Sequence, residues 1–154
     1  MVKQLFSVST KIDVFPKDRE RIKNKKRKFE DELIIGKVSN DFHKLYSYFL
    51  FKNYGVYLEP PLFGSHITIC DGREKLNLER DSEYLKQIQN KQFKVECDPN
   101  IYLHWQFYAI RVYSPELDLI RKTLGLSANY PFHITIGKVA EKSKQSSLLL
   151  RDIC

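Results

Sequence analysis

The chain has 154 residues, of which 42% are hydrophobic and 29% charged, and its formal net charge is +7. This length is enough for one compact domain with its own core and excludes two independent domains. Three cysteines at irregular spacing, no signal-type apolar run and no long apolar segment predict a reduced, cytoplasmic protein without a membrane span. The positive charge favours an anionic ligand.

The first third of the chain predicts a strand, a charged connection and a helix. Residues Leu5–Phe15 alternate between apolar and polar, which is typical of a half-buried strand. The segment Lys17–Asp31 holds eight basic and four acidic residues. Because only one aromatic residue, Phe29, lies among these charges, we interpret it as a solvated helix or connection rather than a phosphate-binding arm. A short apolar run, Leu33–Val38, precedes helical spacing over Asp41–Leu50 that ends by Gly55.

The later elements follow from periodicity and from turn residues. We expect helices over 81–90 and Pro115–Leu124, the latter with proline at its start and Gly125 at its end. Strands are expected over Gln92–Asp98 and Trp105–Tyr113, separated by a turn at Asp98-Pro99-Asn100. The polar segment 140–154 contains three consecutive leucines, which predict a packed terminal segment.

One short pattern occurs twice, as Gly64-Ser65-His66-Ile67-Thr68-Ile69 and as Pro131-Phe132-His133-Ile134-Thr135-Ile136. Successive side chains of a strand point to opposite faces, so the histidine and threonine of each copy share one face and the isoleucines share the other. If the two strands are neighbours in a sheet, two imidazoles and two hydroxyls surround one substrate atom. A single His-x-Thr pattern would carry little weight, but two copies with similar flanks indicate a site.

The groups in these patterns predict acid–base chemistry on a phosphate. Two imidazoles with an ordinary pKa of about 6.5 can hold opposite protonation states, so that one accepts a proton while the other donates one. Threonine hydroxyls suit the non-bridging oxygens of a tetrahedral anion. A ribonucleotide supplies its own 2′-OH as nucleophile, or water attacks a 2′,3′-cyclic phosphate. The residues therefore indicate a phosphodiesterase.

The two motifs resemble those of the two-histidine (2H) phosphoesterase superfamily, whose signature is a pair of His-x-Thr/Ser motifs. The resemblance covers roughly residues 57–139 and includes the strand at 105–112, the helix that begins at Pro115 and the second motif. It implies that His66, Thr68, His133 and Thr135 are the catalytic residues. It also implies an α+β fold in which residues 1–154 form one domain of two lobes, with two antiparallel sheets and outer helices around a central cleft.

The resemblance leaves the substrate open among several classes. The small size and the Lys/Ile/Asn/Tyr-rich composition are similar to viral or phage members, so cleavage of cyclic oligonucleotide or 2′,5′-oligoadenylate immune signals ranks first, in the host cytoplasm. Processing of RNA ends that carry a 2′,3′-cyclic phosphate ranks second. The alternative from another functional class is a binding module without catalytic activity, which would bind RNA or nucleotides. No cofactor, membrane or obligate protein partner is expected.

Three other residues are candidates for contacting the substrate. Tyr130, just before the second motif, and Trp105 could stack on a base, although core packing is the commoner role of any one aromatic residue. Lys138 could reach a substrate phosphate or be a plain surface lysine. We expect no metal site, because the cysteines form no Cys-x-x-Cys and each motif offers a single histidine. His43 is expected on the surface of its helix. His104, beside Trp105, could lie near the cleft but has no partner visible in the sequence.

Overall fold

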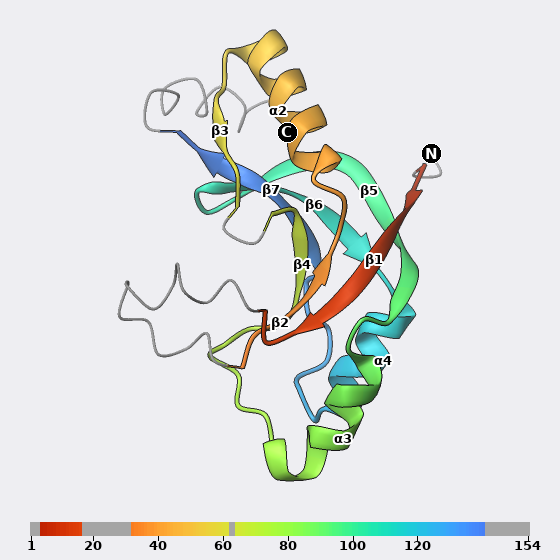
Figure 1. Ribbon diagram of the computed structural model, residues 1–154. Helices are drawn as coiled ribbons and strands as arrows, with labels where there is room; N and C mark the ends of the chain where they lie inside the picture. Colours follow the sequence, from red (N-terminus) through yellow and green to blue (C-terminus); the bar gives the residue numbers. More distant parts are fainter. Residues whose placement is uncertain (1–3, 17–31, 62–63, 141–154) are drawn as a thin grey trace.

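The computed structural model describes residues 4–16, 32–61 and 64–140, which form an α+β fold (Figure 1). The predicted basic segment at 17–31 and the leucines at 148–150 lie outside these residues. That residues 1–154 form one domain of two lobes therefore stays a prediction. The elements in chain order are β1 (Phe6–Val14), β2 (Ile34–Lys37), α2 (Asp41–Tyr54), β3 (Leu58–Glu59), β4 (His66–Cys70), α3 (Leu78–Ile88), β5 (Gln92–His104), β6 (Phe107–Tyr113), α4 (Pro115–Thr123) and β7 (His133–Val139).

The described strands form one continuous antiparallel sheet in the order β3-β7-β4-β2-β1-β5-β6. Strand β7 also pairs with β6, so six of the strands close into a barrel, and β3 is added along the same edge of β7 as β4. The expectation of two separate sheets is wrong for these residues, whereas the α+β class is confirmed. The physical reason is that β7 has hydrogen-bonded partners along both edges, which leaves no break between two sheets.

One predicted turn is part of a strand. Strand β5 runs through Asp98-Pro99-Asn100 and ends at His104, and its pairing with β6 shifts register between Cys97 and Ile101. The backbone N–H of Asn100 donates to the Asp98 carboxylate at 3.0 Å. This local hydrogen bond and the missing N–H of proline suit a bulge, so the chain bends there without reversing. The reversal comes instead at Trp105 and Gln106.

The helices begin and end at residues with suitable side chains. The Ser114 hydroxyl accepts the backbone N–H of Leu117 at the start of α4, where Pro115 is the first helical residue. Helix α3 begins three residues earlier than predicted, because the Asn77 side chain caps it by accepting the N–H of Arg80. Helix α2 ends at Gly55, whose φ of 67° is the left-handed conformation that glycine adopts most readily. No helix among the described segments is long and apolar enough to span a membrane.

The core forms on one face of the motif strands. Ile67, Ile69, Ile134 and Ile136 are fully buried. They belong to one hydrophobic cluster with Leu85 and Ile88 of α3, Leu117 and Ile120 of α4, and Leu124, which directly follows α4. This packing fixes which face of β4 and β7 carries their polar side chains.

Candidate active site

The two motif strands are neighbours. Strand β4 pairs with β7 in antiparallel register, with His66 opposite Thr135 and Ile67 opposite Ile134. One step further along the same register, Thr68 comes opposite His133. Opposite residues of an antiparallel pair project to the same face, so both histidines and both threonines share one face of the sheet.

Burial follows the alternation that the sequence predicts. The four histidine and threonine side chains are half-buried, whereas the isoleucines between them are buried. The polar groups thus remain accessible, while the apolar side of each strand holds it against the core.

Both motif histidines are oriented by the same local hydrogen bond. His66 Nδ1 lies 2.8 Å from the carbonyl oxygen of Gly64, and His133 Nδ1 lies 3.1 Å from that of Pro131. In each case the carbonyl belongs to the residue two positions earlier. A carbonyl can only accept, so Nδ1 carries the proton and donates it. Nε2 is then the nitrogen that takes up or releases a proton in each ring.

The surroundings lower the pKa of both motif histidines. Burial is the main cause for His66, and the nearby imidazole of His133 lowers it further, against a smaller opposite effect of the Gly64 hydrogen bond. For His133 the cause is again burial, with the Pro131 hydrogen bond opposing and His104 adding to the lowering. In the absence of an anion, both rings therefore favour the neutral form at neutral pH.

A third histidine lies beside the second motif. The rings of His104 and His133 have their centroids 5.1 Å apart, at 40° to each other. His104 is the last residue of β5, and the sequence did not reveal its contact with His133 because the turn was placed at 98–100 rather than after His104. The hairpin at Trp105 and Gln106 brings it to this position.

Two cations flank the motif strands. On one side, Lys37 of β2 is opposite His66, and on the other side Arg111 of β6 is opposite His133. Both are thus on the histidine-bearing face. The alternation of charged and apolar residues in their strands was visible in the sequence, but their proximity to the motifs depends on strand order.

The three residues that were predicted to contact the substrate lie in different parts of the fold. Trp105 is 78% exposed in the hairpin next to His104. The Tyr130 ring has the Arg121 guanidinium 4.0 Å from its centre, so stacking on a base can use only its other face. Lys138 is exposed near the end of β7, in the part that pairs with Glu59 of β3, five residues beyond His133.

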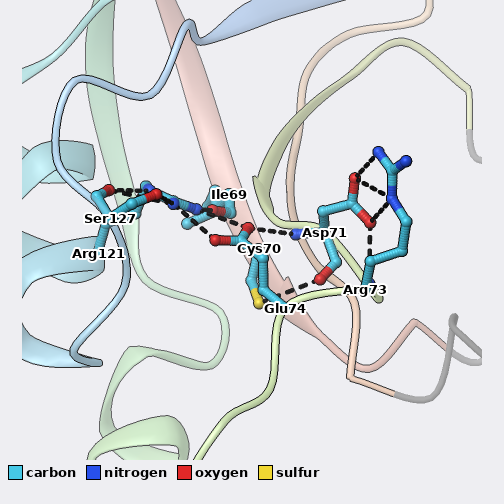
Figure 2. Close-up of polar contacts among 7 residues, drawn as sticks. All are labelled: Ile69, Cys70, Asp71, Arg73, Glu74, Arg121 and Ser127. Carbon is cyan, nitrogen blue, oxygen red and sulfur yellow. Dashed lines mark hydrogen bonds and ion pairs between the residues drawn. The ribbon is translucent and has the colours of Figure 1, made fainter.

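A buried arginine links the end of β4 to the loop that precedes β7 (Figure 2). Arg121 of α4 is 2% exposed and donates to the carbonyl oxygen of Ile69, the last residue of the first motif, at 2.7 Å. It forms two hydrogen bonds with the Glu74 carboxylate, at 2.9 and 2.7 Å, and contacts the carbonyl and hydroxyl oxygens of Ser127. Together with the stacked Tyr130, these contacts fix the exit of β4 against the approach to β7.

Other reactive side chains take no evident part in the site. The thiols of Cys70 and Cys97 are buried, and burial raises the pKa of each to about 12. They are therefore protonated at neutral pH and are poor nucleophiles. Within the described ranges, no three His, Cys, Asp or Glu side chains gather as metal ligands would.

His43 is half-buried rather than on the surface, because its Nδ1 donates to the carbonyl oxygen of Ile136 at 2.8 Å.

Comparison with known families gives one match. The family model described as "Swiss Army Knife, 2H phosphoesterase domain" matches residues 39–143, about two thirds of the chain, and this range contains both motifs. No curated protein and no solved structure matches the chain.

Proposed function

The chain belongs to the 2H phosphoesterase superfamily and is a phosphodiesterase of that type, and we propose that it cleaves small ribonucleotide phosphodiesters with His66 and His133 as acid and base. The observation that carries this proposal is the register of β4 and β7. It sets each motif histidine opposite the threonine of the other motif, on one half-buried face.

The proposed reaction uses the hydroxyl of the substrate itself. The neutral Nε2 of one histidine takes the proton of the ribose hydroxyl next to the scissile phosphate, which is the 2′-OH of a 3′,5′ linkage and the 3′-OH of a 2′,5′ linkage. The oxygen of that hydroxyl forms a bond to the adjacent phosphorus. The bond from phosphorus to the leaving oxygen breaks, and the protonated Nε2 of the other histidine donates its proton to that oxygen. The products are a 2′,3′-cyclic phosphate and a free hydroxyl, and the two histidines have exchanged protonation states.

The environment of the site supports this division of roles. Burial keeps both imidazoles largely neutral in the free protein. A bound phosphate brings negative charge next to them, which raises the pKa of the nearer ring and stabilises one protonated imidazole. In this proposal the hydroxyls of Thr68 and Thr135 donate to the non-bridging oxygens, whose charge grows in the transition state.

We propose that the substrates are cyclic oligonucleotide or 2′,5′-oligoadenylate signals, which the enzyme cleaves in the host cytoplasm. The composition of the chain supports this ranking. Hydrolysis of RNA ends with a 2′,3′-cyclic phosphate is the second candidate. The chemistry of the site suits both substrates, because the histidine base can activate a ribose hydroxyl next to an internal linkage or a water molecule that attacks a 2′,3′-cyclic phosphate.

The test is a product profile over defined oligonucleotides. Cyclic dinucleotides and trinucleotides, 2′,5′-linked oligoadenylate and RNA with a terminal 2′,3′-cyclic phosphate are incubated with the enzyme and analysed by chromatography and mass spectrometry. The matched control for each internal linkage carries a methyl group on the attacking hydroxyl, which is a 2′-O-methyl group for a 3′,5′ linkage and a 3′-O-methyl group for a 2′,5′ linkage. We expect the small signalling molecules to be cut fastest and the methylated controls to resist. Hydrolysis of the terminal cyclic phosphate alone would favour the second candidate, and equal cleavage of the methylated controls would contradict the proposed chemistry.

A further inference from the structure

A third imidazole lies on the face that carries the motif histidines. Tyr102 of β5 pairs opposite Ala109 of β6, which in turn pairs opposite Thr135 of β7. These three residues therefore share the histidine-bearing face. His104 is two residues beyond Tyr102 on the same strand, so its side chain projects to this face as well.

The end of the β5–β6 hairpin curves toward the second motif. His104 pairs opposite Phe107, and Phe107 pairs opposite Lys138. Lys138 is five residues beyond His133 (138 minus 133), which is about 16 Å along a strand. The ring centres of His104 and His133 are nevertheless 5.1 Å apart. The register alone would not bring these rings together, so the curvature of the hairpin does.

The ring of His104 is available to a ligand. The residue is exposed, and its ring contacts are with Tyr102, at 6.4 Å between centres, and with His133. Among the residues that the structure describes, none forms a hydrogen bond with either ring nitrogen of His104. In each motif histidine, by contrast, Nδ1 is bound to a backbone carbonyl. The nitrogens of His104 can therefore form hydrogen bonds with a bound molecule.

The spacing of His104 and His133 fits a single phosphate group. A charge-assisted hydrogen bond from an imidazole to a phosphate oxygen is about 2.8 Å long. Two rings whose centres are 5.1 Å apart can thus each reach an oxygen of the same phosphate. The charge of His104 also acts on its neighbour, since it contributes to the lowered pKa of His133. An anion bound at both rings would offset this repulsion and favour the protonated form of His104.

We propose that His104 is a third histidine of the active site, which donates a hydrogen bond to an oxygen of the scissile phosphate while His66 and His133 transfer the protons. This inference rests on the proposed function and adds a substrate-binding residue to it. His104 itself gains and loses no proton in the reaction. Its role is to hold the phosphate next to His133 and to stabilise the negative charge on the phosphate oxygens.

The kinetic experiment uses a dinucleoside monophosphate, in which the scissile phosphate is the only phosphate. His104→Phe keeps an aromatic ring against His133 but has no donor, whereas His104→Gln loses the ring and keeps an amide donor. The control is Gln106→Ala, an exposed side chain in the same hairpin. His104→Phe should lose about 10- to 100-fold in kcat/KM, as expected for a hydrogen bond to a charged group. His104→Gln should lose less, and the control should be unchanged.

Two results of this experiment would overturn the proposal. Wild-type kinetics of His104→Phe together with a loss in His104→Gln would mean that the ring only packs against His133. A loss in His104→Phe that appears with a longer oligonucleotide and not with the dinucleoside monophosphate would place His104 at another phosphate.

Sulfate binding tests the same contact without cleavage. Sulfate is a tetrahedral anion that keeps its charge over the pH range in which histidine titrates. Sulfate should shift the NMR titration of the His104 ring protons to higher pH, because a neighbouring anion favours the protonated form. Trp105, the only tryptophan of the chain, directly follows His104 and is 78% exposed, so its fluorescence reports the same binding. His104→Phe should weaken sulfate binding by about 10-fold, and Gln106→Ala should not.

The sulfate measurements separate this inference from the proposed function. A shifted His104 titration, together with weaker sulfate binding by His104→Phe, supports the phosphate contact even if the wild type cleaves no ribonucleotide that is tried. A His104 titration that sulfate leaves unchanged overturns the inference even if the wild type cleaves all of them.

Discussion

His66 lies directly opposite Thr135 in the antiparallel pair of β4 and β7. The cross-strand neighbour of each motif histidine is thus the threonine of the other motif. The threonine of its own motif lies two residues further along the same strand. The two copies of the pattern therefore lie side by side on one face. The proposed function treats them as one site, so damage to either copy should affect the same reaction.

The threonines should matter for catalysis and hardly for folding. Thr68→Val and Thr135→Val keep the branched shape and the strand preference but delete the hydroxyl donor. If the hydroxyl bonds strengthen in the transition state, each change should cost about 2 to 4 kcal/mol in kcat/KM. Steady-state kinetics and thermal unfolding of the same preparations check this. Loss of folding with unchanged activity of the folded fraction would make the hydroxyls structural.

Acid should destabilise the protein through the motif histidines. Their pKa values lie below the ordinary value in the folded protein, so below about pH 6.5 the unfolded chain takes up protons that the folded protein does not. The free energy of unfolding should therefore fall as the pH is lowered from about 6.5 towards the folded pKa values. Denaturant titrations at several pH values, with His66→Asn and His133→Asn for comparison, test the sign. The variants should show a weaker fall, and an equal fall in wild type and variants would assign the effect to other groups.

His104 should tune the titration of His133. The charge of His104 lowers the pKa of its neighbour, so His104→Asn should raise the pKa of His133. NMR titration of the ring protons measures this directly, with the His66 signals as an internal comparison that should move less. An unchanged His133 titration would show that the ring contact carries no electrostatic coupling.

The Arg121 network should hold the site together. Removing one partner of a buried ion pair leaves an uncompensated charge, so Arg121→Gln should cost about 3 to 5 kcal/mol of folding free energy. Glu74 is less buried than Arg121, with 23% of its side chain exposed, so Glu74→Gln should cost less. Denaturant unfolding of both variants and of the double variant measures their coupling. Costs that simply add would show that the two groups act independently.

Sequence reasoning predicted the motif strands because alternation is a local property. The half-buried His66 and His133 and the buried isoleucines between motif positions follow directly from it. Strand order is set by pairing between distant segments, so neither the closed barrel nor the neighbours Lys37 and Arg111 could be predicted. One wrongly predicted turn also affected the prediction of the site. Because Asp98-Pro99-Asn100 resembles a turn and is a bulge, the hairpin that brings His104 to His133 was missed.

Activity should not depend on an added divalent metal. The imidazole Nδ1 atoms of His66 and His133 already donate to backbone carbonyls, and the proposed proton transfers need only Nε2. Dialysis against EDTA should leave kcat and KM unchanged, and added magnesium or manganese should not raise the rate of the dialysed enzyme. Restoration of a lost activity by one metal would contradict this.

The central claim is that His66 and His133 act together as acid and base, and single and double alanine variants test it most directly. On a ribonucleotide substrate that the wild type cleaves, either His66→Ala or His133→Ala should lower kcat by about 10²- to 10⁴-fold, and the wild type should show a bell-shaped pH dependence. Because the two groups act as a unit, the double variant should lose little beyond the worse single variant. A near wild-type rate for either single variant, or losses that multiply in the double variant, would contradict the claim.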